Sequence, residues 1–209
     1  MINDDLNTDI VKNTDKDKEM LRRFCAGDEA AFKEIVEDNK DGLYGFIKRF
    51  VLQPDIVEDV FQETFLQLYL SRKTFDIDRP IKPWLFTIAA NKAKDMLRKR
   101  KRDNSVSVGV MADASEATVD DIFNSIASNE DTPDDLTIRA ETSSNVRQLI
   151  DSMPENLREI LLLAYFEQFS YKQMSDILSI PIGTVKSRLH SAVAHFAKKW
   201  KEMKYDVER

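Results

Sequence analysis

Apolar side chains recur at three- and four-residue intervals through most of this chain of 209 residues. The longest such stripe contains Phe32, Ile35, Val36, Leu43, Phe46, Ile47 and Phe50. This spacing brings the side chains onto one face of an α-helix, and that face must be buried. Glycine (5) and proline (6) are scarce, which disfavours a turn-rich β architecture. The sequence therefore predicts an all-α protein.

The helical patterns fall into two blocks, which we expect to be two small helical domains. Residues 17–102 contain four predicted helices, and residues 132–205 contain a second helical block. Between them, residues 103–131 hold seven acidic residues and no Lys or Arg, so the acidic excess of the chain lies there. This polar, weakly periodic segment is predicted to be a flexible acidic linker that leaves the two domains mobile. Residues 1–16 are predicted to be a disordered tail.

Several functional classes are disfavoured by what the sequence lacks. No apolar run approaches the roughly 18–20 residues that span a membrane, and the acidic N-terminus does not resemble a secretory signal. A single cysteine, Cys25, suits a reducing compartment, so we expect a cytoplasmic protein without membrane insertion. There is no glycine-rich phosphate loop, no clustered metal-ligand set and no nucleophile with a convincing base. We therefore expect no enzyme activity, catalytic residue, cofactor, metal or small-molecule substrate.

The stretch Phe169–Ala194 has the layout of a helix-turn-helix. Ser170 and Gln173 have the spacing of a capping box at the start of its first helix. The second helix has an apolar stripe of Val185, Leu189, Ala192, Val193 and Phe196. Its opposite face carries Ser187, His190, Ser191 and Ala194, flanked by Thr184, Lys186 and Arg188. Such a face suits DNA reading in the major groove, although a helical hairpin with a solvated basic face would show the same pattern.

Two charged surfaces are predicted on the first block. The third helix has an acidic face made of Asp55, Glu58, Asp59, Gln62 and Glu63. This face is either simply solvated or a docking surface for a basic partner. The fourth helix ends in a run from Lys92 to Arg102 with seven basic residues and one acid, which indicates a polyanionic partner. The nearby aromatic residues Phe75, Trp84 and Phe86 would stack on unpaired bases, although Trp84 alone is more often a core residue.

Most of the chain resembles the extracytoplasmic-function sigma factors of RNA polymerase. Their second conserved domain is similar to DEAAFKEIVEDNKDGLYGFIKRF, DIVEDVFQETFLQLY and RPIKPWLFTIAANKAKDMLRKRKR. Their fourth domain is similar to MPENLREILLLAYFEQFSYKQMSDILSIPIGTVKSRLHSAVAHF. The resemblance implies a four-helix sigma domain 2 followed by a sigma domain 4 with the helix-turn-helix. It also implies core RNA polymerase, promoter DNA and an anti-sigma factor as partners.

The resemblance implies a role for each predicted surface. The acidic face of the third helix would dock on polymerase. The promoter −10 element would be captured, with one flipped base, by Phe75, Arg79, Lys82, Trp84 and Asn91. Its backbone would be held by Lys92, Lys94, Arg98 and Arg100. The −35 element would be read by Thr184, Lys186, Ser187, Arg188, His190 and Ser191.

This chain departs from the family pattern at a few positions. Many members carry arginine at the positions of Lys186 and Ser191, and Pro80 and Pro83 stiffen the base-capturing loop. These differences affect the promoter sequence that we expect, but not the role. The alternative is a free-standing helix-turn-helix repressor with an effector-binding N-terminal domain. That class usually has a dimer interface, and no dimerisation heptad is visible in the sequence.

Overall fold

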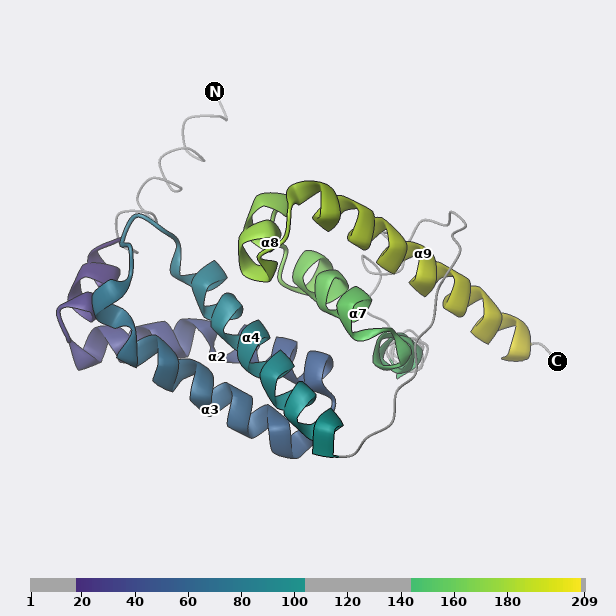
Figure 1. The fold of residues 1–209 in the computed structure, drawn as a ribbon, viewed down its shortest axis with the longest axis horizontal. Helices are drawn as coiled ribbons and strands as arrows, with labels where there is room; N and C mark the ends of the chain where they lie inside the picture. The colour runs from purple at the N-terminus through teal and green to yellow at the C-terminus, as the bar shows by residue number, and fades with distance from the viewer. Residues whose placement is uncertain (1–17, 104–143, 208–209) are drawn as a thin grey trace, which may run out of the picture.

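The computed structural model describes residues 18–103 and 144–207, which form two groups of helices with no strand in those ranges (Figure 1). The all-α prediction is therefore confirmed for this part of the chain. The predicted tail (1–16), residues 104–131 of the predicted linker and residues 132–143 of the predicted second domain lie outside the described residues. No helix within the described ranges is long and apolar enough to cross a membrane.

The first domain consists of helices whose ends follow local sequence signals. Its elements are a helix over 18–25, α2 (Glu29–Val51), α3 (Pro54–Leu70), the short 3-10 helix η1 (Arg72–Thr74) and α4 (Ile81–Asp103). The Asp28 carboxylate accepts hydrogen bonds from the backbone N–H groups of Ala30 and Ala31 at 2.8 and 3.4 Å, and so caps α2. Pro54 occupies the first turn of α3, where its missing N–H leaves no bond unmade.

Aromatic side chains fill the core of the first domain. The largest of them, all fully buried, are Phe24, Phe46, Phe50 and Phe86. The ring centroids of Phe46 and Phe86 lie 5.3 Å apart and join α2 to α4. Helix α4 also packs along α3 (Figure 1).

The second domain contains the predicted helix-turn-helix. Its elements are a helix over 144–152, α7 (Glu155–Leu161), the π-helix η2 (Leu162–Phe166), α8 (Tyr171–Leu178) and α9 (Ile182–Val207). The capping box is confirmed: Ser170 N–H donates to the Gln173 side chain at 2.9 Å, and Gln173 N–H donates to the Ser170 hydroxyl at 3.3 Å. Ser179 ends α8 in the left-handed conformation, with φ of 53°, and turns the chain into α9.

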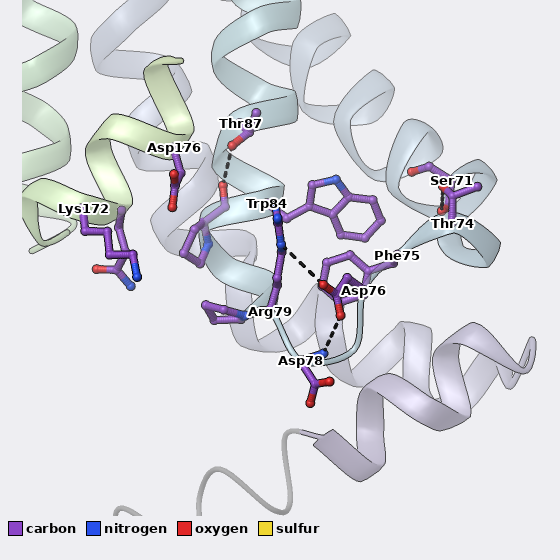
Figure 2. Close-up of a pocket in the computed structure, with 13 residues that line it drawn as sticks. Ser71, Thr74, Phe75, Asp76, Asp78, Arg79, Trp84, Thr87, Lys172 and Asp176 are labelled. Carbon is purple, nitrogen blue, oxygen red and sulfur yellow. Dashed lines mark hydrogen bonds and ion pairs between the residues drawn. The ribbon is translucent and has the colours of Figure 1, made fainter. Parts of the chain in front are cut away.

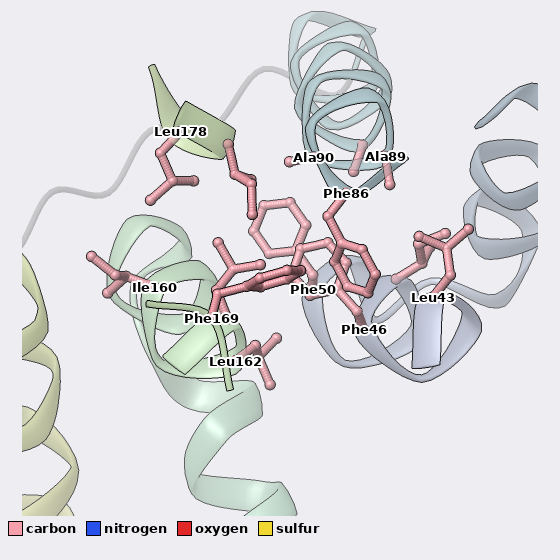
Figure 3. Packing of buried hydrophobic residues seen from close by; sticks show 14 of the residues in the cluster. Leu43, Phe46, Phe50, Phe86, Ala89, Ala90, Ile160, Leu162, Phe169 and Leu178 are labelled. Carbon is pink, nitrogen blue, oxygen red and sulfur yellow. The ribbon is translucent and has the colours of Figure 1, made fainter. Parts of the chain in front are cut away.

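The two domains pack against each other through one continuous apolar core (Figure 3). Helix α8 lies against α4, and η2 lies against α2. At this junction the rings of Phe86 and Phe169 meet edge to face, with centroids 5.0 Å apart. Such a pair contributes about 0.5–1.5 kcal/mol beyond the burial of its area. The structure therefore differs from the expectation of two mobile domains, because side chains at their boundary are buried by each other.

Candidate nucleic-acid and protein interfaces

The predicted DNA-reading residues form one polar surface on α9, here called the recognition face. Its members are Thr184, Lys186, Ser187, Arg188, His190 and Ser191. Val185 and Ala192, both fully buried, hold the opposite side of α9 against the domain, so Lys186, Ser187, His190 and Ser191 are exposed. The expectation that Ala194 belongs to the exposed side is wrong: it is 7% exposed, because the neighbouring helices cover this turn of α9.

The two cations of the recognition face differ in their surroundings. Burial raises the pKa of the Glu159 carboxyl and the charge of Arg188 lowers it, whereas Lys186 has no carboxylate partner among the described residues. The nearest favourable contact of Lys186 is the ring of Tyr171, whose centroid lies 5.9 Å from the ammonium nitrogen. The Ser187 and Ser191 hydroxyls donate to the carbonyls of Thr184 and Ser187 at 3.2 and 3.0 Å. These bonds leave the hydroxyl oxygens able to accept. The face therefore offers hydrogen-bonding groups together with the positive charge of Lys186, which no described carboxylate compensates.

A pocket of about 910 Å³ lies between the loop that precedes α4 and the start of α8 (Figure 2). Phe75 from the loop stacks on the indole of Trp84, with ring centroids 4.1 Å apart and planes 18° from parallel. Arg79 pairs with Asp76 at 3.5 Å at the rim. The opposite wall comes from α8 and includes Lys172 and Asp176 (Figure 2). The pocket thus combines an aromatic stack with charged groups of both signs.

The basic run of α4, defined as Lys92, Lys94, Arg98 and Arg100, is held by carboxylates. Lys92 pairs with Glu63 at 3.1 Å and Arg100 pairs with Asp55 at 2.7 Å, so two of these cations lie against α3. Arg98 pairs with Asp95 on the exposed surface of α4 itself, at 2.9 Å. Exposed pairs of this kind contribute at most about 1 kcal/mol each, so they are easily exchanged for phosphate contacts.

The acidic face of α3 is only partly engaged by these pairs. Glu58 accepts a hydrogen bond from the Tyr44 hydroxyl at 2.8 Å, and this bond raises the pKa of Tyr44. Asp59 and Gln62 are exposed and have no side-chain partner among the described residues. Beside them lies an apolar groove that includes Phe61, Phe65 and Leu66. This combination of free acid and apolar surface suits a basic, partly apolar partner.

Two cations predicted to face DNA are instead directed at the second domain. Lys94 Nζ lies 2.8 Å from Oε1 of Glu159 in α7, and Lys82 Nζ lies 3.2 Å from Oε2 of Glu167. Burial raises the pKa of Glu159, and the charge of Lys94 acts in the opposite direction. Asn91, also predicted to face DNA, is exposed on α4. The structure therefore joins the predicted −10 surface to the predicted −35 domain.

Sequence reasoning missed the residues that join the domains. Burial of Glu159 had one sequence signal, which is its position directly before the apolar pair Ile160 and Leu161 in a helix. A second signal was Gly42 inside α2, because glycine within a helix costs roughly 0.5–1 kcal/mol relative to alanine. A Cβ atom on Gly42 would lie 3.3 Å from Oε2 of Glu167, so the missing side chain permits this close approach.

The described residues contain no group of three or more His, Cys, Asp or Glu side chains that could hold a metal ion. The two histidines lie on α9, and burial lowers the pKa of His195. His190 is exposed on the recognition face.

Comparison with known proteins gives the family of both domains. Residues 35–103 match the family model Sigma-70 region 2, and residues 143–196 match Sigma-70, region 4. The chain is 32% identical over 173 residues to the ECF RNA polymerase sigma factor SigW of Bacillus subtilis, an alignment that covers 83% of this chain and 90% of SigW. It is 33% identical over 178 residues to the RNA polymerase sigma-H factor of Pseudomonas aeruginosa, covering 85% and 90% of the two chains.

Two solved structures share the fold. CnrH in complex with the cytosolic domain of CnrY matches with a TM-score of 0.62 at 20% identity, covering 89% of this chain and 97% of CnrH. The sigma factor RpoE in complex with the anti-sigma factor NepR from Bartonella quintana matches with a TM-score of 0.60 at 22% identity, covering 81% and 96%. Both regions, in this order, and relatives above 30% identity show that the chain belongs to the extracytoplasmic-function sigma factors, the alternative sigma subunits that direct RNA polymerase in transcription initiation.

Proposed function

We propose that this sigma factor selects promoters through two separate DNA contacts, one on each domain, while the polymerase supplies the chemistry. The recognition face of α9 reads the −35 element in the major groove. The pocket beside Phe75 and Trp84 captures an unpaired base of the −10 element. The observation that carries this proposal is the exposed polar surface of α9 around Lys186, held in place by the buried side of the same helix.

Base readout by α9 is supported by the types of side chain that it presents. Lys186 supplies a donor for guanine, and His190 and Ser191 supply groups that either donate or accept. A good contact to one base contributes about 1–3 kcal/mol of discrimination against the wrong base. Thr184, Ser187 and Arg188 complete the proposed contact surface, with Arg188 half-buried at its edge.

Base capture by the first domain requires the pocket to offset the loss of stacking in the duplex, which costs a few kcal/mol. Stacking of a base on an aromatic side chain returns about 1–3 kcal/mol. Phe75 and Trp84 form such a platform, and Arg79, which pairs with Asp76, lines the same pocket. Lys82 is proposed to contribute its charge to base capture after it leaves Glu167. Asn91 takes part in base capture, and the basic run of α4 follows the DNA backbone after exchanging its present carboxylate partners for phosphates.

The acidic face of α3 is proposed to dock on core RNA polymerase. The centre of this face, Asp59 and Gln62, is exposed. At its edges, Asp55 and Glu63 form ion pairs with cations of α4, and Glu58 accepts a hydrogen bond from Tyr44. An inhibitory anti-sigma protein is proposed as a further partner, because a similar solved structure is a complex of that kind. Work with core polymerase implies a cytoplasmic location.

The test is transcription in vitro with purified chain, core RNA polymerase and sheared genomic DNA, followed by sequencing of the transcript starts. We expect discrete starts that share two upstream motifs. The variant Lys186→Ala should lower transcription from these starts by roughly fivefold or more, since one lost base contact is worth about 1–3 kcal/mol. The matched control is Lys199→Ala, on the same helix but paired with Glu202 at 2.8 Å.

Transcript starts that do not depend on the chain would contradict the proposal. Tight, sequence-specific binding of the chain alone to operator DNA, without any effect of core polymerase, would indicate the repressor instead.

A further inference from the structure

Gly183 differs from the other described glycines, because the described part of the chain gives no reason for it. Gly27 has a φ of 95°, which favours glycine. Gly42 and Gly45 leave room for side-chain atoms that a Cβ atom would meet at 3.3 and 2.8 Å. Gly183 has the ordinary backbone of the first turn of α9, and a Cβ atom there would meet no described atom within 4 Å. Alanine is the more stable residue in a helix, so the missing side chain points to an approaching group outside the chain.

Gly183 lies on the same side of α9 as the recognition face. Lys186, Ser187 and His190 follow it by three, four and seven residues, and this spacing places all four residues on one side of the helix. All four are exposed, whereas Val185 on the opposite side is fully buried. A group that approaches Gly183 therefore belongs to the partner of the recognition face, which is promoter DNA in the proposed function.

The neighbouring side chains leave the backbone of Gly183 uncovered. The Ser187 hydroxyl donates to the carbonyl of Thr184 at 3.2 Å, and the Lys186 ammonium lies 5.9 Å from the ring centroid of Tyr171. Neither Ser187 nor Lys186 comes within 4 Å of the position that a Cβ atom of Gly183 would take. The first turn of α9 is therefore open to a close approach by DNA.

Ile182 supplies apolar surface beside this open backbone. It directly precedes Gly183, lies one helical turn before Lys186 and is 44% exposed. A single exposed isoleucine is ordinary on a protein surface, but this one borders a face whose exposed side chains are polar. The C5-methyl group of thymine is the apolar group that a base edge presents in the major groove.

We infer that Ile182 and Gly183 are specificity-determining residues of the −35 contact. The methyl group of a thymine packs on Ile182 and lies over the backbone of Gly183, where a Cβ atom would exclude it. This inference rests on the proposed reading of the −35 element by α9. It adds an apolar contact to a face that otherwise offers only hydrogen bonds and charge.

The first experiment adds a methyl group to the protein. Gly183→Ala and the unchanged chain are compared in transcription with core polymerase, from the starts that depend on the unchanged chain, and in urea denaturation. We expect a higher urea midpoint, since alanine favours the helix, together with at least about fivefold less transcription, since the Cβ atom collides with DNA. Lys199→Ala, on the same helix and outside the recognition face, is the control and should match the unchanged chain in transcription.

Transcription by Gly183→Ala at the level of the unchanged chain would overturn the close approach. A lower urea midpoint would also overturn it, because the fold itself would then require glycine at this position. Co-purification with core polymerase should be equal for all three proteins. A loss of co-purification by Gly183→Ala would assign the open turn to polymerase instead of DNA, and so would overturn the inference.

The second experiment removes a methyl group from the DNA. Each thymine of the −35 element is replaced in turn by uracil, which presents the same hydrogen-bond donors and acceptors without the methyl group. We expect transcription by the unchanged chain to fall about fourfold at one position, the value of burying one such group. Ile182→Ala should lose nothing further at that position. Uracil without effect at every position, or an Ile182→Ala variant that responds to uracil as the unchanged chain does, would overturn the thymine contact.

Failure of the proposed function gives a different result from failure of this inference. If α9 does not read the −35 element, Lys186→Ala and Gly183→Ala both keep the transcription of the unchanged chain. If α9 reads the element but no base approaches Gly183, Lys186→Ala loses transcription and Gly183→Ala keeps it.

Discussion

The carboxylate of Glu159 lies in surroundings that oppose its negative charge. Burial is the largest influence and raises its pKa, Lys94 of α4 and Arg188 of α9 lower it, and Glu155 on the same helix raises it. A group whose pKa is raised on folding contributes stability that is fully present below its unfolded pKa and is lost as pH rises through the folded value. For Glu159 this loss begins above the ordinary value of 4.5.

This sign gives a prediction for the pH dependence of stability. As pH rises from 4.5, the free energy of unfolding of the unchanged chain should fall relative to that of Glu159→Gln, which has no titrating group at this position. Urea denaturation of both proteins at several pH values between about 4.5 and 7.5 measures the difference. A difference that stays constant over this range would show that the folded structure does not perturb Glu159.

At the scale of elements, α8 is a short helix whose start is fixed by its own sequence. In the capping box, the backbone N–H groups of Ser170 and Gln173 each donate to the side chain of the other residue. On the opposite side of the helix, Met174 and Ile177 are buried in the core. Because an isolated helix of this length is not stable in water, the cap and the buried face must both contribute.

The variant Ser170→Ala should lower the free energy of unfolding by about 1 kcal/mol, the usual effect of removing a serine cap. Urea denaturation measures this change. Ser152→Ala is the matched control, since its hydroxyl donates only to the Leu149 carbonyl of its own helix, at 2.7 Å. Equal stability of the two variants would mean that the cap does not hold α8.

Element boundaries were predictable where a local signal exists, and the junction of the domains was not. Asp28, Pro54 and Ser170 each mark a helix start, and the structure has helices beginning after or at these residues. Periodicity also gave the recognition face, with the exception of Ala194. Periodicity does not indicate which surface covers an apolar side chain. The contact between Phe86 and Phe169 therefore could not be predicted from the sequence.

The π-helix shows the same limit. Leu162 to Phe166 is apolar throughout, and such a run contains no information on whether its hydrogen bonds span four or five residues. The roles of the predicted DNA and polymerase contacts remain predictions. The structure adds that each of the six cations assigned to the −10 element lies beside a carboxylate, and this depends on long-range packing for Lys82 and Lys94.

At the scale of the whole molecule, the centre of the acidic face of α3 stands out as a surface without an ion-pair partner among the described residues. Asp59 is exposed on α3 without a partner among the described residues. Asp59→Arg should therefore abolish co-purification with core RNA polymerase while leaving the fold intact, because the new charge meets the basic partner that we propose. Glu37→Arg, at another exposed acidic position in the first domain, is the control. Normal assembly of the Asp59 variant with polymerase would refute docking through this face.

The ion pairs on α4 also affect how strongly the chain binds chromosomal DNA without sequence preference. Proteins bind DNA without sequence preference mainly because their cations displace the counterions condensed along the phosphates. A lysine that already lies beside a carboxylate, as Lys82 and Lys94 do, gains little from that exchange. Chromosomal DNA offers on the order of 10⁶–10⁹ competing sites. A chain whose cations are neutralised in this way binds those non-specific sites more weakly and remains available to polymerase.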